Sequence, residues 1–447
     1  MAQPSEMPPE ARDLARLMRT TARDIFLCAL RECSIAAAFE RNVECERGVL
    51  RVCGDLYDLR SYQRTFVVAM GKAAHPMAEE LQKRIGSSAS GIVASSVPPP
   101  GAQLPGLRYF DGGHPLPNEE SLRAADAIRH ALPPRSPQSL VIYLISGGAS
   151  SIVERPIDEE ISLEDLVATY RALVHCGAPI AEINAVRKHL SAVKGGRMAK
   201  LAAPAQQVSI LVSDVPEGKL DALASGPTMP DTTTVEECYE IVRRYNLLES
   251  FPAPVRELFA RRALEETPKP DDPAFHRCRW WPVLSSAVAQ KAAEHFAPPG
   301  FAVEIDNRVD DWDYAKAADH LLGRARELRQ GAAQVCLISG GEVTVEVKGK
   351  PGVGGRNQQF ALYCAPRIAG ENIAVLSAGT DGIDGSSAAA GAVADGTTLA
   401  RAAALGLDAA TSLATFDATP FFEQLDDLVV TGPTGNNVRD LRILLAY

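Results

Sequence analysis

The stretch Leu-Ile-Ser-Gly-Gly at residues 144–148 decides the fold, and the same five residues return at 337–341. Each copy closes a short run of apolar, β-branched residues, which predicts a buried strand that stops on a hydroxyl and two glycines. Paired glycines let the backbone approach a ligand and turn its amides toward an anion. Two such loops suggest an anion-handling edge at each copy, although either copy alone is equally typical of a tight strand-to-loop turn. Beside the other motifs, the first copy is the expected ligand contact, and the second is expected to support the site through Glu342.

Further apolar runs predict the remaining strands, and segments with helical periodicity separate them. The expected strands lie at residues 65–70, 91–96, 208–212, 281–284, 301–305, 344–347, 373–377, 427–430 and 441–445. The expected helices lie at residues 5–33, 73–85, 163–201, 235–245, 254–265, 313–330 and 357–364. This alternation is typical of an α/β architecture, here a three-layer domain with a mostly parallel sheet followed by a second α/β domain.

The length of the chain predicts two domains, because 447 residues exceed the usual size of one. The polar segment at 266–277 carries three prolines and is the expected linker. It divides the chain into a first domain at residues 1–265 and a second domain at residues 278–447.

The composition excludes several classes of partner and compartment. A formal net charge of −10 argues against nucleic acid or an anionic membrane as the main partner, whereas a small anionic substrate still fits. Nine cysteines without a Cys-x-x-Cys pair indicate neither a disulfide framework nor a zinc site. No run approaches the length of about 18 apolar residues that a membrane span needs, and residues 1–23 lack the apolar core of a signal peptide. We expect a cytoplasmic protein, and leave open whether it forms a homo-oligomer.

Polar residues at the carboxyl ends of the expected strands are the candidates for chemistry, because ligands gather there in open α/β sheets. Lys72 follows one strand and precedes a helix, so it can add a point charge to a phosphate or carboxylate held by helix amides. A surface lysine that caps a turn would fit the same position. The other polar residues expected at strand ends are Asp111, Ser146, Asp214, Ser339, Glu342 and Asp381.

Arg356 stands between a pair of glycines and an expected helix. This position suits a bidentate contact with phosphate. It is also typical of a flexible connection with an exposed arginine. Asp214 and Asp381 each end an apolar strand, where a carboxylate can hold Mg²⁺ or cap the following turn. The turn at residues 112–115 could place His114 in a cleft, but the preferred interpretation is a structural histidine. Since no nucleophile or redox motif accompanies them, these residues favour phosphoryl transfer, which needs positioning and charge neutralisation.

A series of short motifs, taken in order, resembles the glycerate 2-kinase family, whose C-terminal part is called the MOFRL domain. The motifs extend over nearly the whole chain, and their order makes the set specific. They lie at residues 70–74, 113–117, 146–148, 188–197, 213–215, 224–228, 340–342, 354–358, 379–385 and 431–435.

The resemblance implies an N-terminal Rossmann-like domain, a C-terminal MOFRL-type α/β domain and an active site in the cleft between them. It implies phosphorylation of D-glycerate to 2-phosphoglycerate with ATP and Mg²⁺. Lys72 and Arg356 would stabilise the transferring phosphoryl group, Asp214 would hold the metal or the attacking hydroxyl, and Asp381 would be the second metal ligand. The residues implied to bind substrate or nucleotide are Gly71, Ser146, Gly147, Gly148, Lys194, Gly354, Gly355, Asn357, Thr380 and Asp381.

Three alternatives stay open, because the chain departs from the family pattern around its loops. A kinase of a related small hydroxy acid would fit the same motifs. An NAD(P)H-dependent hydroxypyruvate reductase would need a Gly-x-Gly-x-x-Gly turn after the first strand, which this chain lacks. A non-catalytic sugar-acid sensor would not need Lys72 or Arg356. The departures lie at residues 149–151, 217–219, 359, 386–388 and 415–418.

Overall fold

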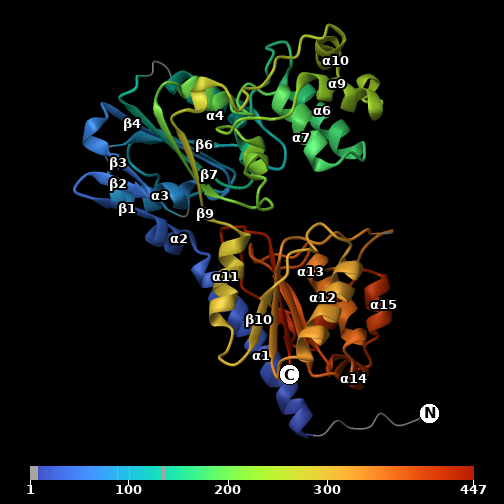
Figure 1. Ribbon diagram of the computed structural model, residues 1–447. Coiled ribbons are helices and arrows are strands. Elements are labelled where there is room, and N and C mark those ends of the chain that lie inside the picture. Colours follow the sequence, from blue (N-terminus) through green and yellow to red (C-terminus); the bar gives the residue numbers. More distant parts are fainter. Residues whose placement is uncertain (1–8, 88, 100, 133–135, 348) are drawn as a thin grey trace. The chain divides into compact units, whose positions relative to one another are not determined.

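The structure is a computed structural model that describes residues 9–87, 89–99, 101–132, 136–347 and 349–447. The chain divides into a central unit, Ala38–Val283, and a terminal unit that joins Met1–Ala37 to Leu284–Tyr447. Each unit is an α/β structure with its own six-stranded sheet, which confirms the predicted fold class (Figure 1). None of the described helices is long and apolar enough to cross a membrane.

The central unit is built around a sheet with the strand order β6-β5-β4-β7-β8-β9, in which β4 to β8 run parallel. The chain enters at β4, builds outward through β5 and β6, and returns to add the other three strands beside β4. The carboxyl ends of β4 and β7 therefore flank the point where the order reverses, and ligands bind at such points. The strands are β4 (Arg64–Met70), β5 (Ser90–Ser95), β6 (Leu107–Asp111), β7 (Ser139–Ile145), β8 (Gln206–Val212) and β9 (Cys278–Leu284).

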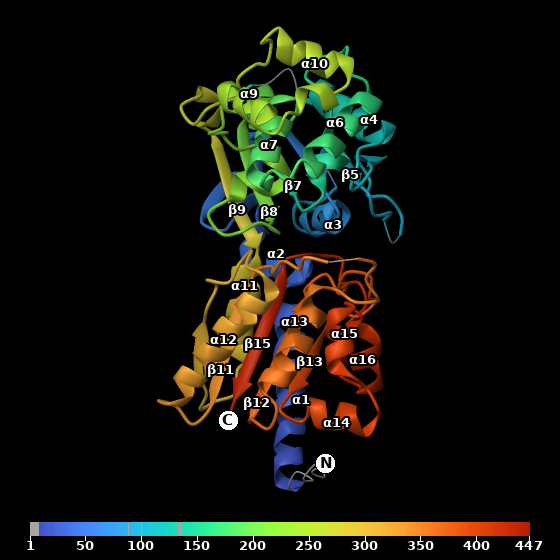
Figure 2. The same cartoon turned by 90° about the vertical axis from the view of Figure 1, so that its right-hand side faces the viewer.

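Helices complete the central unit around this sheet. Alternate residues of β4, namely Phe66, Val68 and Met70, share a core with α4, α5 and α8, whereas α3 packs on β4, β5 and β7 outside that core. Helices α6, α7, α9 and α10 lie together and have an apolar core of their own (Figure 2). A small antiparallel sheet precedes β4, with strands β1 (Val43–Glu46), β2 (Val49–Val52) and β3 (Asp55–Asp58). The helices are α2 (Ile35–Asn42), α3 (Ala74–Ile85), α4 (Glu119–Ala131), α5 (Ala149–Ile152), α6 (Leu163–His175), α7 (Ile180–His189), α8 (Arg197–Ala202), α9 (Val235–Arg244) and α10 (Ala253–Ala260).

The terminal unit has the strand order β10-β11-β15-β12-β13-β14. The last strand, β15, runs antiparallel to both β11 and β12, so these two strands end at the edge where β15 begins. Gly340 of β11 pairs with Leu441, and Gly379 of β12 pairs with Asp440. The strands are β10 (Ala302–Ile305), β11 (Val335–Gly340), β12 (Ile373–Gly379), β13 (Gly391–Asp395), β14 (Leu428–Val429) and β15 (Asp440–Ala446).

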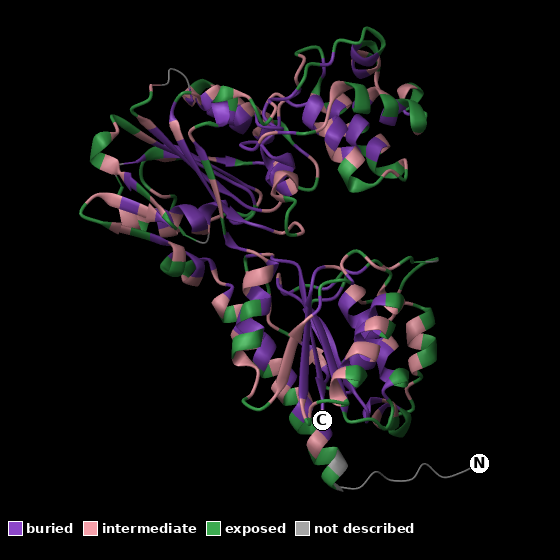
Figure 3. Ribbon diagram, in the orientation of Figure 1, coloured by how far each residue is buried: buried purple, intermediate pink, exposed green. Residues whose placement is uncertain are grey.

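Helices cover both faces of this second sheet. Cys336 and Ile338 of β11 share a core with α1 and α11, whereas Val335 and Leu337 face a core with α12 and α13. This alternation makes a three-layer structure, with buried strands between helices whose outer surfaces are exposed (Figure 3). The helices are α1 (Pro9–Glu32), α11 (Ser286–Phe296), α12 (Tyr314–Arg329), α13 (Arg356–Cys364), α14 (Thr398–Ala404), α15 (Ala409–Ala414) and α16 (Ala418–Gln424).

The division into units differs from the predicted domains at residues 1–265 and 278–447 in two places. The first helix, α1, belongs to the terminal unit, because Met18, Ala22 and Phe26 pack in the core of its sheet. The expected linker at 266–277 is part of the central unit, where the Asp231 N–H donates to the Pro268 carbonyl at 3.0 Å and β9 follows directly. Residues 5–8 of the expected first helix lie outside the described residues.

Two predicted elements also differ from the observed ones. The helix expected over 163–201 is three helices, because Pro179 interrupts it before α7 and Gly195 and Gly196 have positive φ angles of 55° and 81° before α8. The strand expected over 344–347 is reduced to one bridge between Asp313 and Thr344. Alternation of polar and apolar residues is not sufficient for a strand where no neighbouring strand supplies a full ladder of hydrogen bonds.

Candidate active site

In the central unit, three neighbouring strands end in the loops that the sequence singled out. Lys72 follows β4, residues 146–148 follow β7, and Asp214 follows β8. The Lys72 N–H donates to the Gly147 carbonyl at 3.0 Å, and the Ala73 N–H donates to Ser146 Oγ at 3.0 Å. These bonds join the loop after β4 to the loop after β7. Because Ser146 is 2% exposed, its hydroxyl braces the turn that carries Lys72, whereas the sequence predicted a ligand contact for it.

The glycines in these loops are required by close approach. Gly71 has a φ of 114°, and a Cβ there would overlap the Ser146 hydroxyl. A Cβ on Gly147 would overlap the Asp214 carboxylate, so Asp214 lies directly against the Ser-Gly-Gly loop. Lys72 is exposed and Asp214 half-buried, which leaves one cation and one carboxylate accessible beside the same loop.

His114 also belongs to this loop cluster, although the sequence favoured a structural role for it. A Cβ on Gly148 would lie 2.7 Å from His114 Cδ2 and 3.3 Å from Lys72 Cγ, so the imidazole and the lysine stem flank the same glycine. Burial and, secondarily, the charge of Lys72 lower the pKa of His114, which keeps the imidazole neutral at pH 7. The signal for this position is the glycine turn at residues 112–115, which allowed a place for His114 in a cleft.

Two backbone donors in the first loop remain available to a ligand. Among the described residues, none accepts a hydrogen bond from the N–H of Gly147 or Gly148. Gly148 has a φ of 84° and immediately precedes α5, so its amide belongs to a turn and not to a ladder. Adjacent amides in such a turn can hold an anion, and Lys72 adds a positive charge beside them.

Lys194 was expected to bind substrate or nucleotide, but the structure places it in a buried ion pair. Its side chain is 1% exposed and pairs with the Glu154 carboxylate. Glu154 also accepts hydrogen bonds from Tyr170 Oη at 2.5 Å and from Ser191 Oγ at 2.6 Å. Burial lowers the pKa of Lys194 well below its usual value. The pair anchors the chain that leaves α5, and the Lys194 ammonium does not reach a ligand loop.

In the terminal unit, Arg356 is the first residue of α13 and is held by two carboxylates. Its Nε and Nη2 donate to the two oxygens of Asp440 at 2.6 and 3.0 Å, and Nη2 lies 2.9 Å from Glu342 Oε1. Burial opposes the charge on Arg356, but the bonds to Asp440 outweigh it and raise the pKa of the guanidinium. Arg356 Nη1 makes no hydrogen bond with a described residue. The guanidinium is thus oriented by its own protein and keeps one donor group for a ligand.

The N-terminus of α13 already carries a carboxylate. Asp384 accepts from the N–H groups of Asn357 and Gln358 at 3.0 and 2.8 Å, and a Cβ on Gly355 would overlap it. Burial raises the pKa of Asp384 to about 6. Asn357, expected to bind nucleotide, is 1% exposed and accepts from Ser377 Oγ at 2.6 Å. Asp384 therefore occupies the place that an anion would take at this helix.

The other residues expected to bind ligand in the terminal unit have structural contacts. Gly354 exchanges hydrogen bonds with Ser386, because its N–H donates to Ser386 Oγ at 3.2 Å and its carbonyl accepts from the Ser386 N–H at 3.0 Å. Thr380 is 2% exposed and donates to the Arg439 carbonyl at 2.7 Å. Asp381 Oδ1 accepts from the Ile383 N–H at 3.2 Å, so it caps its own turn, which was one of its two predicted roles. These three residues shape the edge where β12 ends.

The predicted metal ligands Asp214 and Asp381 belong to different units. Within the residues that the structure describes, no group of three or more His, Cys, Asp or Glu side chains could hold a metal ion. A site for Mg²⁺ does not require such a group, because this ion keeps several waters and binds through one or two carboxylates plus substrate phosphates. Asp214 and Asp381 are both half-buried, but Asp381 Oδ1 already accepts from the Ile383 N–H, whereas Asp214 lies beside the loop whose amides can hold phosphate, so Asp214 fits that pattern better.

The second Leu-Ile-Ser-Gly-Gly loop differs from the first in its contacts. The Gly340 N–H donates to Asn307 Oδ1 and the Glu342 N–H donates to Asp310 Oδ1, each at 3.0 Å. The Gly341 carbonyl accepts from Arg442 Nη1 at 3.2 Å. Side chains of the unit therefore occupy the amides of Gly340 and Glu342, which makes this copy less suited to an anion than the first. The loop supports Glu342, one of the two carboxylates that hold Arg356.

An α/β sheet that presents a lysine, a carboxylate and unengaged amides at the ends of adjacent parallel strands is typical of an enzyme that acts on an anionic substrate. Comparison with known families agrees with this class. Residues 21–260 match the family described as a domain of unknown function, DUF4147, and residues 335–440 match the MOFRL family.

Relatives of known or named activity extend over most of the chain. The D-glycerate 2-kinase of Thermotoga maritima is 35% identical over 85% of this chain and 90% of its own length. A protein of Agrobacterium vitis, named only provisionally as a hydroxypyruvate reductase, is 37% identical over 86% of this chain and 99% of its own length. The solved structure of glycerate kinase from Thermotoga maritima superposes with a TM-score of 0.83 at 31% identity, covering 97% of this chain and all 100% of that one. The chain belongs to the glycerate kinase family with a MOFRL domain, and the prediction of a kinase is confirmed.

Proposed function

We propose that this protein phosphorylates D-glycerate on its 2-hydroxyl, with ATP as the donor and Mg²⁺ as the metal. The observation that carries the proposal is the loop cluster of the central unit, in which Lys72 flanks the unengaged amides of Gly147 and Gly148. Phosphoryl transfer needs just such positioning and charge neutralisation, with little covalent participation by the protein. The relative from Thermotoga maritima is named for this activity.

The central unit would supply the groups that hold the anions. The amides of Gly147 and Gly148 and the Lys72 ammonium would bind phosphate oxygens or the glycerate carboxylate. Asp214 would hold Mg²⁺ or accept the proton of the attacking hydroxyl. A bound Mg²⁺ would neutralise negative charge on the donor's phosphates. Neutral His114 would donate or accept a hydrogen bond next to Lys72 without adding a second positive charge.

The terminal unit would supply Arg356. Its bidentate contact with Asp440 fixes the plane of the guanidinium, and Nη1 is the donor left to contact the transferring phosphoryl group. An oriented arginine of this kind stabilises charge that develops in the transition state without paying for reorganisation. Asp440 and Glu342 would act as positioning residues, since they act through Arg356.

A direct assay tests the proposal. Purified protein is incubated with D-glycerate, ATP and Mg²⁺, and 2-phosphoglycerate is resolved from 3-phosphoglycerate. We expect ADP release coupled to 2-phosphoglycerate. Absence of ADP release above background would reject the kinase activity, and a product phosphorylated only on the 3-hydroxyl would reject the regiochemistry. Related small hydroxy acids in parallel reactions measure the acceptor specificity.

The reductase alternative rests on the provisional names of two relatives from Agrobacterium vitis and is tested alongside. Hydroxypyruvate is offered with NADH or NADPH, and oxidation of the nicotinamide is followed by absorbance. We expect no oxidation above the protein-free rate, since the turn after β4 is Gly-Lys-Ala-Ala and lacks the Gly-x-Gly-x-x-Gly spacing. Turnover of hydroxypyruvate without glycerate kinase activity would replace the proposed function with the alternative.

A further inference from the structure

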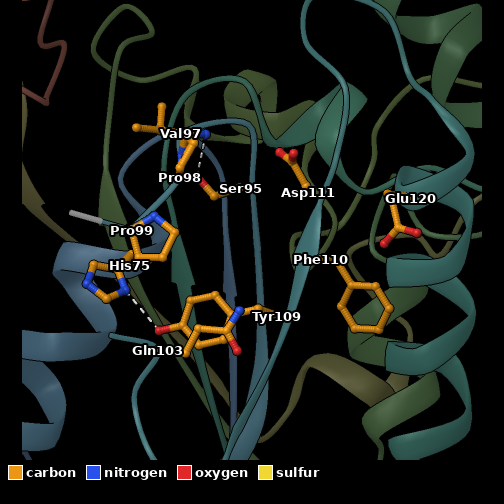
Figure 4. A pocket seen from close by; sticks show the side chains of 10 residues that line it. All are labelled: His75, Ser95, Val97, Pro98, Pro99, Gln103, Tyr109, Phe110, Asp111 and Glu120. Carbon is orange, nitrogen blue, oxygen red and sulfur yellow. Dashed lines mark hydrogen bonds between the residues drawn. The ribbon is translucent and has the colours of Figure 1, made fainter. Parts of the chain in front are cut away.

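A pocket of about 280 Å³ lies in the central unit, at the carboxyl ends of β5 and β6. Its volume is near the lower end of the range for small-molecule sites, about 300 Å³. None of the residues proposed above to handle phosphate lines it, so the pocket is a separate feature of the same sheet edge. Figure 4 shows its lining, with side chains from both strands and from helices on either side.

The two sides of the pocket differ in chemistry. Pro99, His75 and Tyr109 gather on one side, and the carboxylates of Asp111 and Glu120 lie on the other (Figure 4). An aromatic and apolar wall suits a flat ring, whereas carboxylates suit hydroxyl donors and disfavour phosphate. This combination favours a ligand with a planar base and a hydroxylated, uncharged sugar.

The walls are held in place before any ligand binds. Tyr109 Oη lies 2.8 Å from His75 Nδ1 and accepts from the Leu104 N–H at 3.2 Å, which fixes the ring. Ser95 Oγ accepts from the Val97 N–H at 3.0 Å. In contrast, none of the described residues donates a hydrogen bond to the Asp111 carboxylate, which therefore keeps its acceptor capacity for a ligand.

The pocket adjoins the lysine loop through the backbone. His75 lies in the first turn of α3, three positions after Lys72 in the sequence. The Gly71 N–H donates to the Ala94 carbonyl at 3.1 Å, and the Gly112 N–H donates to the Ser95 carbonyl at 3.0 Å. The loops after β4, β5 and β6 are thus linked in series, so a ligand in the pocket can extend along the sheet edge toward Lys72.

We propose that this pocket holds the nucleoside part of the phosphoryl donor. The base lies against Tyr109 and His75, the ribose hydroxyls donate to Asp111 and Glu120, and the phosphates extend toward Lys72. The inference rests on the proposed function, because the pocket would bind the nucleoside of the same donor whose phosphates the Lys72 loop would bind. The acidic side of the pocket excludes the phosphate end and so sets the direction in which the donor binds.

The experiment compares binding of ADP with binding of inorganic pyrophosphate, which lacks the nucleoside, by isothermal titration calorimetry. Asp111→Asn and Tyr109→Ala are the pocket variants. Glu120→Gln is matched with Glu119→Gln, a neighbour in the first turn of α4 that does not line the pocket. We expect each pocket variant to weaken ADP binding about tenfold, with pyrophosphate binding unchanged. Glu119→Gln should change neither.

Kinetics separate this inference from the proposed function. In an active kinase the pocket variants should raise KM for ATP about tenfold, and KM for glycerate should stay as in the wild type. The melting temperature should stay unchanged in Asp111→Asn and Glu120→Gln, whereas Tyr109→Ala lowers it because the Leu104 N–H loses its acceptor. Unchanged ADP binding and unchanged KM for ATP in all three variants, or a rise in KM for glycerate instead, would overturn the inference while the kinase stands. Weakened ADP binding in a protein without glycerate kinase activity would reject the proposed function and keep the pocket assignment.

Discussion

In the central unit, Leu-Ile-Ser-Gly-Gly ends β7 with the amides of Gly147 and Gly148 unengaged by any described residue, and Lys72 beside them. In the terminal unit, the same five residues end β11 with the amide of Gly340 bound to Asn307 and the amide of Glu342 bound to Asp310, and the Gly341 carbonyl accepts from Arg442. The serines differ as well. Ser146 Oγ accepts a backbone hydrogen bond, whereas Ser339 Oγ is buried without a hydrogen-bond partner among the described residues.

The comparison separates what a motif encodes from what its neighbours add. Both copies produce a buried strand and a glycine turn, because those features depend on the five residues themselves. The capacity to bind an anion depends on which side chains reach the turn from other elements. In the terminal unit, Asn307 and Asp310 from the loop after β10 accept hydrogen bonds from the backbone of the turn. The turn there positions Glu342, which pairs with Arg356.

The largest effect is expected from Lys72→Ala, which removes the only lysine placed at the first loop by the described contacts. Loss of a charge that stabilises the transition state should lower kcat for glycerate phosphorylation about 10³-fold. Because Lys72 is exposed, the melting temperature should not change. Lys83→Ala in α3, the helix that follows Lys72, is the matched control, because its ammonium pairs with Glu80. Retained turnover in Lys72→Ala would reject the assigned role.

The first glycines of the two copies give the next contrast. Gly147→Ala forces the Asp214 carboxylate away from the first loop, so kcat/KM should fall about 100-fold with little change in stability, since half-buried Asp214 can turn toward solvent. Gly340→Ala drives a Cβ into Gln290, which is 4% exposed and has no room to move. Urea unfolding should show a loss of about 1–3 kcal/mol for Gly340→Ala. Equal effects of the two variants on activity would contradict the conclusion that only the first loop takes part in the reaction.

The N-termini of the helices near the two loops also differ, because only one of them carries a carboxylate. The pH dependence of the free energy of unfolding measures this difference. Ala73 gives α3 no side-chain cap, whereas Asp384 caps α13 as a buried carboxylate with its pKa raised to about 6. The unfolded pKa of an aspartate is about 3.9, so between about pH 4 and 6 the folded chain holds the proton more tightly. The contribution of Asp384 to the free energy of unfolding therefore falls as pH rises through this window, by up to about 1.4 kcal/mol per pH unit.

Urea unfolding of the wild type and of Asp384→Asn measures this contribution as a difference, so that other titrating groups cancel. We expect the difference in the free energy of unfolding to change between about pH 4 and 6 and to stay level above that range. A difference that is constant across the whole range would show that this carboxyl group has an ordinary pKa. The corresponding helix of the central unit has no such carboxylate to titrate at its N-cap.

The sequence was sufficient for what local pattern determines. The predicted strands of both sheets agree with β4, β8 and β12 to within about two residues at most ends, because continuous β-branched runs are typical of strands buried on both faces. The lysine turn after β4 and the helix that begins at Arg356 were also predicted. These features need only nearest neighbours along the chain.

The sequence was insufficient where a partner comes from far along the chain. Lys194 was assigned to a ligand because nothing local reveals Glu154, forty positions earlier, as its buried counter-ion. Asn357 was also predicted to bind a ligand, but its N–H donates to Asp384 and its side-chain oxygen accepts from Ser377. For His114 the sequence favoured a structural role over a place in a cleft, because its proximity to Gly148 arises only when β6 and β7 have taken their places in the sheet. Long-range pairing decides which polar residues remain for a ligand.

The smallest effect, and the most direct comparison of the two copies, comes from removing the hydroxyl of each serine. Ser146→Ala leaves the Ala73 N–H without its acceptor, so the free energy of unfolding should fall by about 1 kcal/mol, and kcat should fall as the Lys72 turn loosens. Ser339→Ala removes a buried hydroxyl that has no partner among the described residues, so it should raise the free energy of unfolding by up to about 1 kcal/mol and leave kcat unchanged. Urea unfolding and steady-state kinetics on the pair decide the matter, since losses of equal size would mean that Ser339 bonds as Ser146 does.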